Sequence, residues 1–104
     1  MPLSFAPCRM IKKAARTHNL ALEGLGLHEI PAEIFDSVDG LKIFDFSKNK
    51  LEVLPPLFGK RYAKTMKRLD LAMNRIARVP SFLSTFKQLH TLDLSGNALT
   101  TAGL

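Results

Sequence analysis

Cysteine and long apolar runs are scarce in this chain of 104 residues, and tryptophan is missing. Cys8 stands alone, so the chain forms no internal disulfide, and with no evident base to activate it we do not expect a nucleophile. No run of about 18 apolar residues is present to span a bilayer. We therefore expect one soluble domain and a cytoplasmic location.

Groups that carry out chemistry are equally scarce. His18, His28 and His90 have no cysteine or carboxylate partners at the spacing of metal ligands. Gly24 and Gly26 lack the further glycines, the lysine and the hydroxyl group of a phosphate-binding loop. The sequence therefore predicts no metal site, no cofactor and no enzymatic activity.

What the chain does contain is internal repetition with a period of 23 to 25 residues. Four segments share one pattern around a pivot position, which is Leu25 in the first segment and Asn49, Asn74 and Asn97 in the others. Leu or Phe stands five and three residues before each pivot, and Leu or Ile stands two residues after it. Such self-similarity is typical of proteins built from stacked repeats.

At these residues the sequence resembles the leucine-rich-repeat family, in the intracellular type whose unit reads LxxLxLxxNxLxxLPxxI. The resemblance covers residues 17–101 and includes a proline followed by apolar residues in three units: Pro31 with Ile34 and Val38, Pro55 with Phe58 and Tyr62, and Pro80 with Leu83 and Phe86. It implies an α/β solenoid of about four repeats, with a short parallel sheet on its concave face. We assign the repeats to residues 18–40, 41–65, 66–88 and an incomplete 89–104, after an N-terminal segment of residues 1–17.

The pattern has a physical meaning of its own. In Leu-x-Leu, a period of two places both leucines on the inner side of a short strand and the residue between them in solvent. One repeat cannot cover its leucines, so stacking buries them between neighbours. Where the chain leaves each strand, an inward amide satisfies backbone groups of the turn. We interpret Asn49, Asn74 and Asn97 as a structural ladder of this kind.

The first repeat departs from this rule because Leu25 cannot form such hydrogen bonds, so a local feature must compensate. From Pro7 to Thr17, apolar and basic residues alternate at helical spacing, which predicts an amphipathic helix. Its apolar residues are Met10, Ile11, Ala14 and Ala15. We interpret this helix as a cap that covers the stack and shields the apolar turn. The alternative is a mitochondrial presequence, because no acidic residue precedes Glu23.

The repeat register assigns the solvent side of the strands, which is the concave face. Its residues are Asn19, Ala21, Glu23, Ile43, Asp45, Ser47, Arg68, Asp70, Ala72, Thr91, Asp93 and Ser95. Asp45, Asp70 and Asp93 share one column on adjacent strands, where like charges repel and invite a basic group from a partner protein. The competing interpretation is a solvated column whose charges are screened.

The net charge of +6 is concentrated elsewhere. The basic residues Lys60, Arg61, Lys64, Lys67, Arg75 and Arg78 surround the start of the third repeat. They are candidates for binding RNA or an acidic membrane surface. Tyr62 is the single aromatic residue among them and no RNA-recognition motif is present, so a solvated basic surface is the competing interpretation.

The sequence as a whole predicts a non-catalytic protein-interaction module or scaffold that binds a partner protein through its concave face. The alternatives are an anion-binding protein using residues 60–78 and a regulatory subunit of an enzyme complex. The fourth repeat lacks the proline segment, and Ala102 stands where the earlier units have Ile30, Leu54 and Val79. We expect this end to be covered by a second copy, a partner or further repeats, because exposed leucines would cost several kcal/mol.

Overall fold

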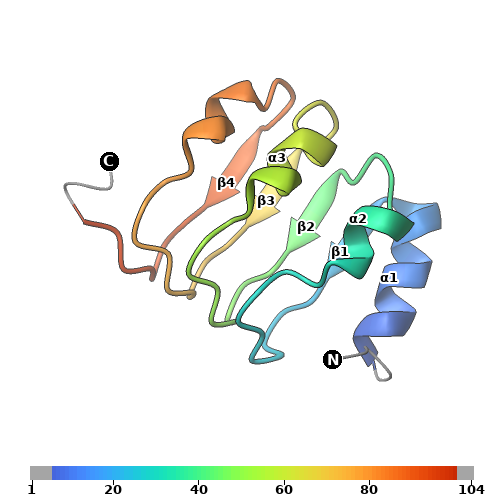
Figure 1. Ribbon diagram of the computed structural model, residues 1–104, viewed down its shortest axis with the longest axis horizontal. Helices are drawn as coiled ribbons and strands as arrows, with labels where there is room; N and C mark the ends of the chain where they lie inside the picture. The colour runs from blue at the N-terminus through green and yellow to red at the C-terminus, as the bar shows by residue number, and fades with distance from the viewer. Residues whose placement is uncertain (1–5, 101–104) are drawn as a thin grey trace.

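The computed structural model describes residues 6–100, with side chains described from Arg9 onward. Four short strands recur at the predicted period: β1 Asn19–Ala21, β2 Ile43–Asp45, β3 Arg68–Asp70 and β4 Thr91–Asp93. They form one parallel sheet in the order β1-β2-β3-β4 (Figure 1). The sheet confirms the predicted solenoid of four stacked units. Ala102 and the side chain of Cys8 lie outside the described residues.

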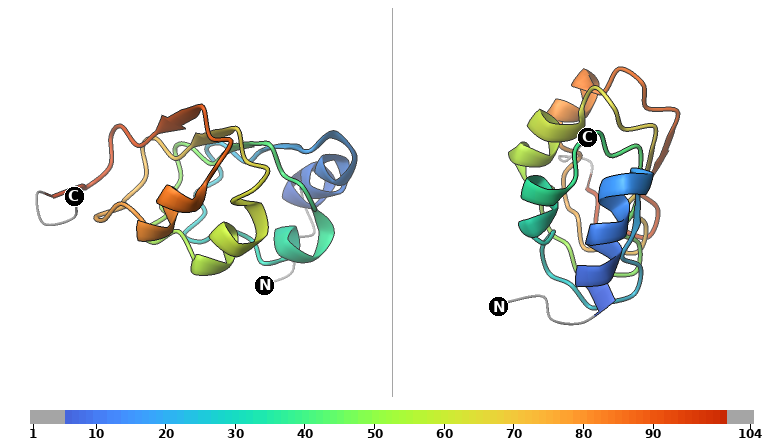
Figure 2. Two further views of the ribbon diagram at one scale, coloured as in Figure 1. Left: turned by 90° about the horizontal axis from the view of Figure 1, so that it is seen from above. Right: turned by 90° about the vertical axis from the view of Figure 1, so that its right-hand side faces the viewer.

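Three short helices follow the turns and lie across the core from the sheet (Figure 2). They are α2 Glu33–Ser37, α3 Pro56–Tyr62 and the 3-10 helix η1 Ser81–Thr85. Proline stands just before or at the start of each one, because its fixed φ suits the entry into a helix and its missing N–H is not needed there. The apolar residues predicted to follow these prolines, Val38, Tyr62 and Phe86, are all buried.

The predicted amphipathic helix is present as α1 Ala6–Thr17, which packs beside β1 and α2. Ile11 and Ala14 are one turn apart and point into the core, where both are buried. Met10 and Ala15 were predicted to share this apolar face, but both remain exposed, Met10 at 38%. The helix is therefore confirmed with a narrower buried face, and its role as a cap stays a prediction.

The core between sheet and helices is a chain of aromatic rings. Phe58 lies at its centre, with ring centroids 5.4 Å from Phe44, 5.2 Å from Tyr62 and 6.3 Å from Phe86. Further contacts extend the chain to Phe35, Phe46 and Phe82. Because these rings come from different repeats, they join the repeats into one core.

The asparagines predicted to form a structural ladder lie in the turns that follow the strands and form hydrogen bonds there. Asn74 Nδ2 donates to the carbonyls of Phe46 and Leu71 at 2.9 and 3.0 Å, and its Oδ1 accepts from Leu51 N–H at 3.0 Å. Asn97 repeats the arrangement between the third and fourth units. Each amide thus links its own turn to the preceding one and leaves those buried backbone groups paired.

The hydrogen bonds that the turn at Leu25 needs come from the next repeat. Asn49 Oδ1 accepts from both Leu25 N–H, at 3.1 Å, and Leu27 N–H, at 2.9 Å. Its Nδ2 donates to the carbonyls of Leu22, Phe46 and Ser47. One side chain therefore serves two turns, which is why the first repeat tolerates leucine at its own pivot.

The residue before each pivot adopts a left-handed conformation. These residues are Gly24, Lys48, Met73 and Gly96, with φ between 57° and 68°. The N–H groups of the first three reach the next unit: Gly24 donates to Ser47 O at 3.0 Å, Lys48 to Ala72 O at 2.9 Å and Met73 to Ser95 O at 2.8 Å. Glycine suits this conformation, whereas Lys48 and Met73 adopt it at a cost of about 1 kcal/mol that the surrounding ladder offsets.

Burial falls off in the fourth repeat. Leu92 is 40% exposed and Leu94 and Leu99 are half-buried, whereas the equivalent Leu69 of the third repeat is fully buried. Phe86 stays buried through its contacts with Phe58 and Phe82. That a second copy, a partner or further repeats cover these leucines stays a prediction.

Candidate functional site

The sheet presents the concave face in the predicted register. Its first row is Asn19, Ile43, Arg68 and Thr91, and its second row is Ala21, Asp45, Asp70 and Asp93. A third row, just past the strands, is Glu23, Ser47, Ala72 and Ser95. A shallow hollow of about 220 Å³ lies over β2, β3 and β4 and is lined by both of the first two rows. The structure therefore brings the predicted residues together on one surface.

Each aspartate of the column also has a structural contact. Asp45 Oδ1 accepts from Ser47 N–H at 2.9 Å, and Asp70 Oδ1 from Ala72 N–H at 3.0 Å. Asp93 Oδ1 accepts from both the hydroxyl and the N–H of Ser95, and these hydrogen bonds hold the pKa of Asp93 below its usual value. One oxygen of each carboxylate thus fixes the end of its strand. Within the described residues, no hydrogen bond engages the other oxygen, Oδ2.

Ser47 differs from the prediction, because its side chain is not available at the surface. Only 5% of the residue is exposed, and its hydroxyl donates to Asp45 Oδ1 at 2.7 Å and to Glu23 Oε2 at 3.4 Å. Ser95, at the equivalent position in the fourth repeat, is exposed. Burial of Ser47 follows from its place between two flanking units. We therefore remove Ser47 from the candidate contact residues.

A groove of about 490 Å³ joins the concave face to α1 and was not predicted. Met10, Lys13 and Thr17 of α1 form one wall. Strands β1 and β2 line the rest of the groove through Asn19, Leu20, Ala21, Ile43 and Asp45. Most of the lining is apolar. The signal in the sequence was the pair of large apolar residues, Met10 and Ile43, on otherwise polar surfaces.

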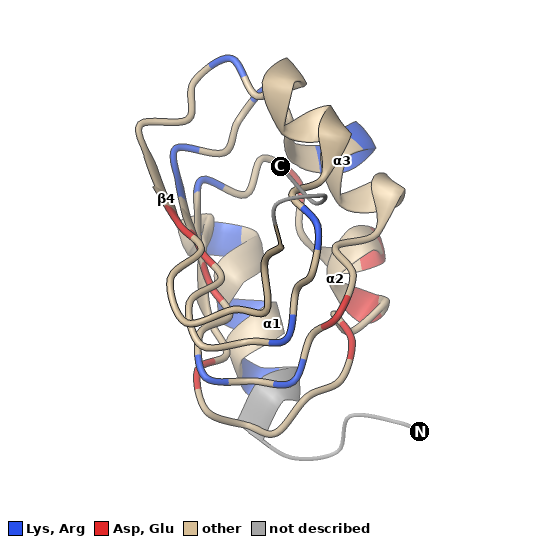
Figure 3. Ribbon diagram, turned by 90° about the vertical axis from the view of Figure 1, so that its left-hand side faces the viewer, with Lys and Arg blue, Asp and Glu red and all other residues tan. Residues whose placement is uncertain are grey.

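The predicted basic region is divided into two groups. Lys60 and Arg61 lie in the last turn of α3, and Lys64 and Lys67 follow before β3, whereas Arg75 and Arg78 come after β3. Figure 3 shows basic segments along both edges of the stack. Four of the six residues thus precede β3 and two follow it, and their use as an anion-binding site stays a prediction.

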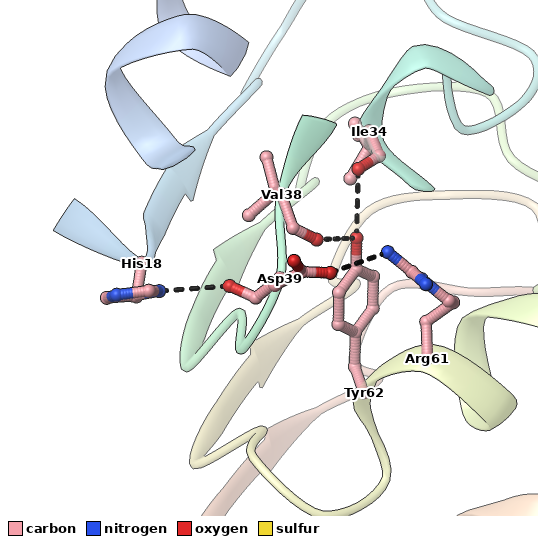
Figure 4. A network of polar contacts seen from close by, with 6 residues as sticks. All are labelled: His18, Ile34, Val38, Asp39, Arg61 and Tyr62. Carbon is pink, nitrogen blue, oxygen red and sulfur yellow. Dashed lines mark hydrogen bonds and ion pairs between the residues drawn. The ribbon is translucent and has the colours of Figure 1, made fainter. Parts of the chain in front are cut away.

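Tyr62, the one aromatic residue of that region, belongs to the core and is fully buried. Its hydroxyl lies 3.1 Å from the carbonyl oxygen of Ile34 and 2.9 Å from that of Val38 (Figure 4). Beside it, Arg61 forms an ion pair with Asp39 at 2.8 Å. His18 Nδ1 lies 3.0 Å from the Asp39 carbonyl oxygen. Tyr62 therefore has no face free for stacking on a nucleic-acid base.

Burial raises the pKa of the Tyr62 phenol to about 12 from a usual value of 10.0. The fold thus favours the protonated phenol, and this stabilisation is complete below about pH 10 and is lost as the pH rises through 12. Urea unfolding across this range should show a steeper alkaline loss of stability in the natural chain than in Tyr62→Phe. The variant itself should lose about 1 to 2 kcal/mol at neutral pH. Parallel alkaline profiles would contradict the prediction.

The part of the chain that the structure describes contains neither a metal site nor a helix that could span a membrane. Residues 9–100, whose side chains are described, contain no group of three or more His, Cys, Asp or Glu placed to hold a metal ion. None of the described helices has the length and apolar character to cross a membrane. His28 and His90 are exposed.

Comparison with known proteins identifies repeats in the same segments. Residues 40–60 match the family model described as Leucine Rich Repeat, and residues 88–104 match a second one, described as Leucine Rich repeat. Human (Homo sapiens) vasorin is 36% identical over 91 residues, covering 86% of this chain and 13% of vasorin. Human podocan-like protein 1 is 33% identical over 104 residues, covering 99% of the chain and 19% of that protein.

A third relative is the leucine-rich repeat-containing G-protein coupled receptor 5 of Rattus norvegicus. The two sequences are 30% identical over a match of 108 residues, gaps included. The match covers 83% of this chain and 12% of the receptor. The chain thus spans less than a fifth of the length of these three relatives.

Proposed function

This chain belongs to the leucine-rich-repeat family, and on that premise we propose that it is a non-catalytic module whose concave face binds a partner protein. The observation that carries the proposal is the apolar groove between α1 and the sheet. Met10 and Ile43 give it two large apolar side chains, and the charged rows of β3 and β4 lie beside it. An apolar centre with a polar rim is the usual anatomy of a protein–protein interface.

The charges divide the concave face into two parts. The part over β1 and β2 is mainly apolar and suits a buried side chain of the partner. The part over β3 and β4 carries Arg68 beside Asp70 and Asp93, whose Oδ2 atoms remain to accept from donors of the partner. Because β2 and β3 are fixed by backbone hydrogen bonds on both sides and β1 and β4 on one side, the face loses little entropy on binding.

Two substitutions test these two parts separately. Ile43→Ser removes the apolar anchor, and Asp70→Lys reverses a charge in the middle of the column. Each is expected to weaken partner capture by at least about tenfold, as loss of a central interface contact does. The measurement is the recovery of co-purifying proteins from native extract with the tagged chain, quantified by mass spectrometry for each variant.

Asp70→Asn is the matched control for the charge. Its side-chain oxygen still accepts from Ala72 N–H, so the strand end is preserved while the negative charge is removed. Glu33→Lys changes an exposed charge on α2, away from the concave face, and should leave capture unchanged. Full recovery of the same proteins with Ile43→Ser and Asp70→Lys would remove the concave face from the binding site.

The location of the protein stays a proposal based on its sequence. A single cysteine and the absence of acidic residues before Glu23 favour the cytoplasm and the mitochondrion, respectively. A fluorescent fusion of the chain distinguishes the two compartments directly. Mitochondrial import followed by removal of the basic helix would contradict its proposed role as a cap.

A further inference from the structure

A second groove lies away from the concave face, between consecutive repeats. It encloses about 560 Å³ and is lined by Val53 and Pro56 of the second repeat and by Arg75, Ala77, Arg78 and Phe82 of the third, among others. These segments run from the asparagine turns towards α3 and η1. We call this site the flank groove. It shares no residue with the concave face, so both surfaces remain available at the same time.

The lining of the flank groove is mainly apolar, and several of its apolar side chains are exposed to solvent. Val53 is 70% exposed, and Ala77 and Pro56 are exposed as well. Phe82 is half-buried. Its ring stacks on that of Phe86, which fixes its position in the wall of the groove. Exposed apolar side chains that gather in a recess mark a place where a partner's apolar side chain can be buried.

The charge of the flank groove is unbalanced. Arg75 and Arg78 both line it and are exposed. The one ion pair within the described residues joins Arg61 to Asp39, so neither arginine is paired with a carboxylate there. Glu52 also lines the groove but lies outside ion-pair distance of both. Two guanidinium groups beside an apolar recess can therefore bind carboxylates of another molecule.

We propose that the flank groove docks an acidic segment of a partner protein that carries a leucine or similar apolar residue. The apolar side chain occupies the recess near Val53 and Phe82, and neighbouring carboxylates bind Arg75 and Arg78. Nucleic acid fits the same surface less well, because single-stranded bases usually stack on several exposed aromatic rings and the groove has only Phe82, which is half-buried.

Fluorescence anisotropy with labelled model peptides tests the proposal on the full chain. The probe is a peptide of alternating Glu and Leu, and the comparison peptides replace every Leu by Ser or every Glu by Lys. We expect the Glu-Leu peptide to bind at least about tenfold more tightly than either of the others. The double variant Arg75→Glu, Arg78→Glu should lose this binding by at least tenfold, and Val53→Ser should weaken it severalfold.

Arg9→Glu is the matched control, because it reverses one exposed charge on α1 that lines neither the flank groove nor the concave face. It should leave peptide binding unchanged, and circular dichroism should show that every variant stays folded. Equal binding of the Glu-Ser peptide, or equal weakening by Arg9→Glu, would overturn the proposal in favour of nonspecific charge attraction. Tighter binding of single-stranded RNA, lost in the Arg75 and Arg78 variant, would overturn it in favour of nucleic acid.

Discussion

Replacement of Phe58 by alanine is expected to lower the free energy of unfolding by about 3 to 5 kcal/mol. Phe58 is fully buried, and its ring contacts those of Phe44, Tyr62 and Phe86. These partners come from β2, from α3 and from the residue after η1. Alanine would leave a cavity that the relatively rigid stack cannot close, so both the apolar transfer energy and the ring contacts are lost.

The measurement is urea unfolding followed by circular dichroism, with the natural chain as reference. Leu57→Ala is the matched control, because it truncates the adjacent residue of the same helix, which is 45% exposed. It should cost less than about 1 kcal/mol. Domains of this size are commonly stable by about 5 to 15 kcal/mol, so Phe58→Ala should remove a large part of the total. Similar losses for the two variants would contradict the aromatic chain as the centre of the core.

The repeat pattern, together with the family resemblance that it carries, was enough to predict the fold. Once Leu-x-Leu fixes the inward positions, stacking of identical units determines the strand register, and the structure pairs Asp45, Asp70 and Asp93 as expected. The asparagine ladder follows from the same geometry. These features could be predicted because each depends on the spacing between neighbouring repeats and not on distant contacts.

Features that depend on packing between unlike segments could not be predicted from the repeat pattern. The groove beside Ile43 exists because α1 leaves Met10 exposed, which the helical pattern of the residues does not determine. Ser47 and Ser95 occupy the same position of their repeats. Only Ser47 has a described repeat on both sides, and it is buried. The division of the basic residues by β3 likewise depends on where the strand begins and ends.

The position of Asn49 follows from the repeat pattern, whereas its service to the turn at Leu25 depends on packing between unlike repeats. Its replacement by alanine should lower the free energy of unfolding by about 2 to 4 kcal/mol. Five hydrogen bonds end on this one side chain, two from N–H groups of the first repeat and three to carbonyl groups. The side chain is buried, so water does not easily replace it. Without Asn49, the turn at Leu25 has no amide of its own to satisfy it, since its pivot is leucine.

Asn97→Ala is the natural comparison, because it removes the equivalent amide from the fourth repeat. Asn97 is half-buried, so water can reach the groups that it leaves, and the expected loss is about 1 kcal/mol. Asn49→Asp separates the two roles of the amide. The carboxylate still accepts from Leu25 and Leu27, but its second oxygen faces the carbonyls of Leu22 and Phe46 and repels them.

Amide hydrogen exchange locates the damage and distinguishes a ladder from general loosening. In Asn49→Ala, the N–H groups of Leu25 and Leu27 should exchange much faster, because their acceptor is gone. Those of Leu51 and Ile76, which donate to Asn74 and Asn97, should change only as much as global stability does. In Asn49→Asp, the Leu25 and Leu27 groups should stay protected at neutral pH even though the chain is less stable. Equal acceleration at all four positions would mean that Asn49 supports the whole stack and not the first turn in particular.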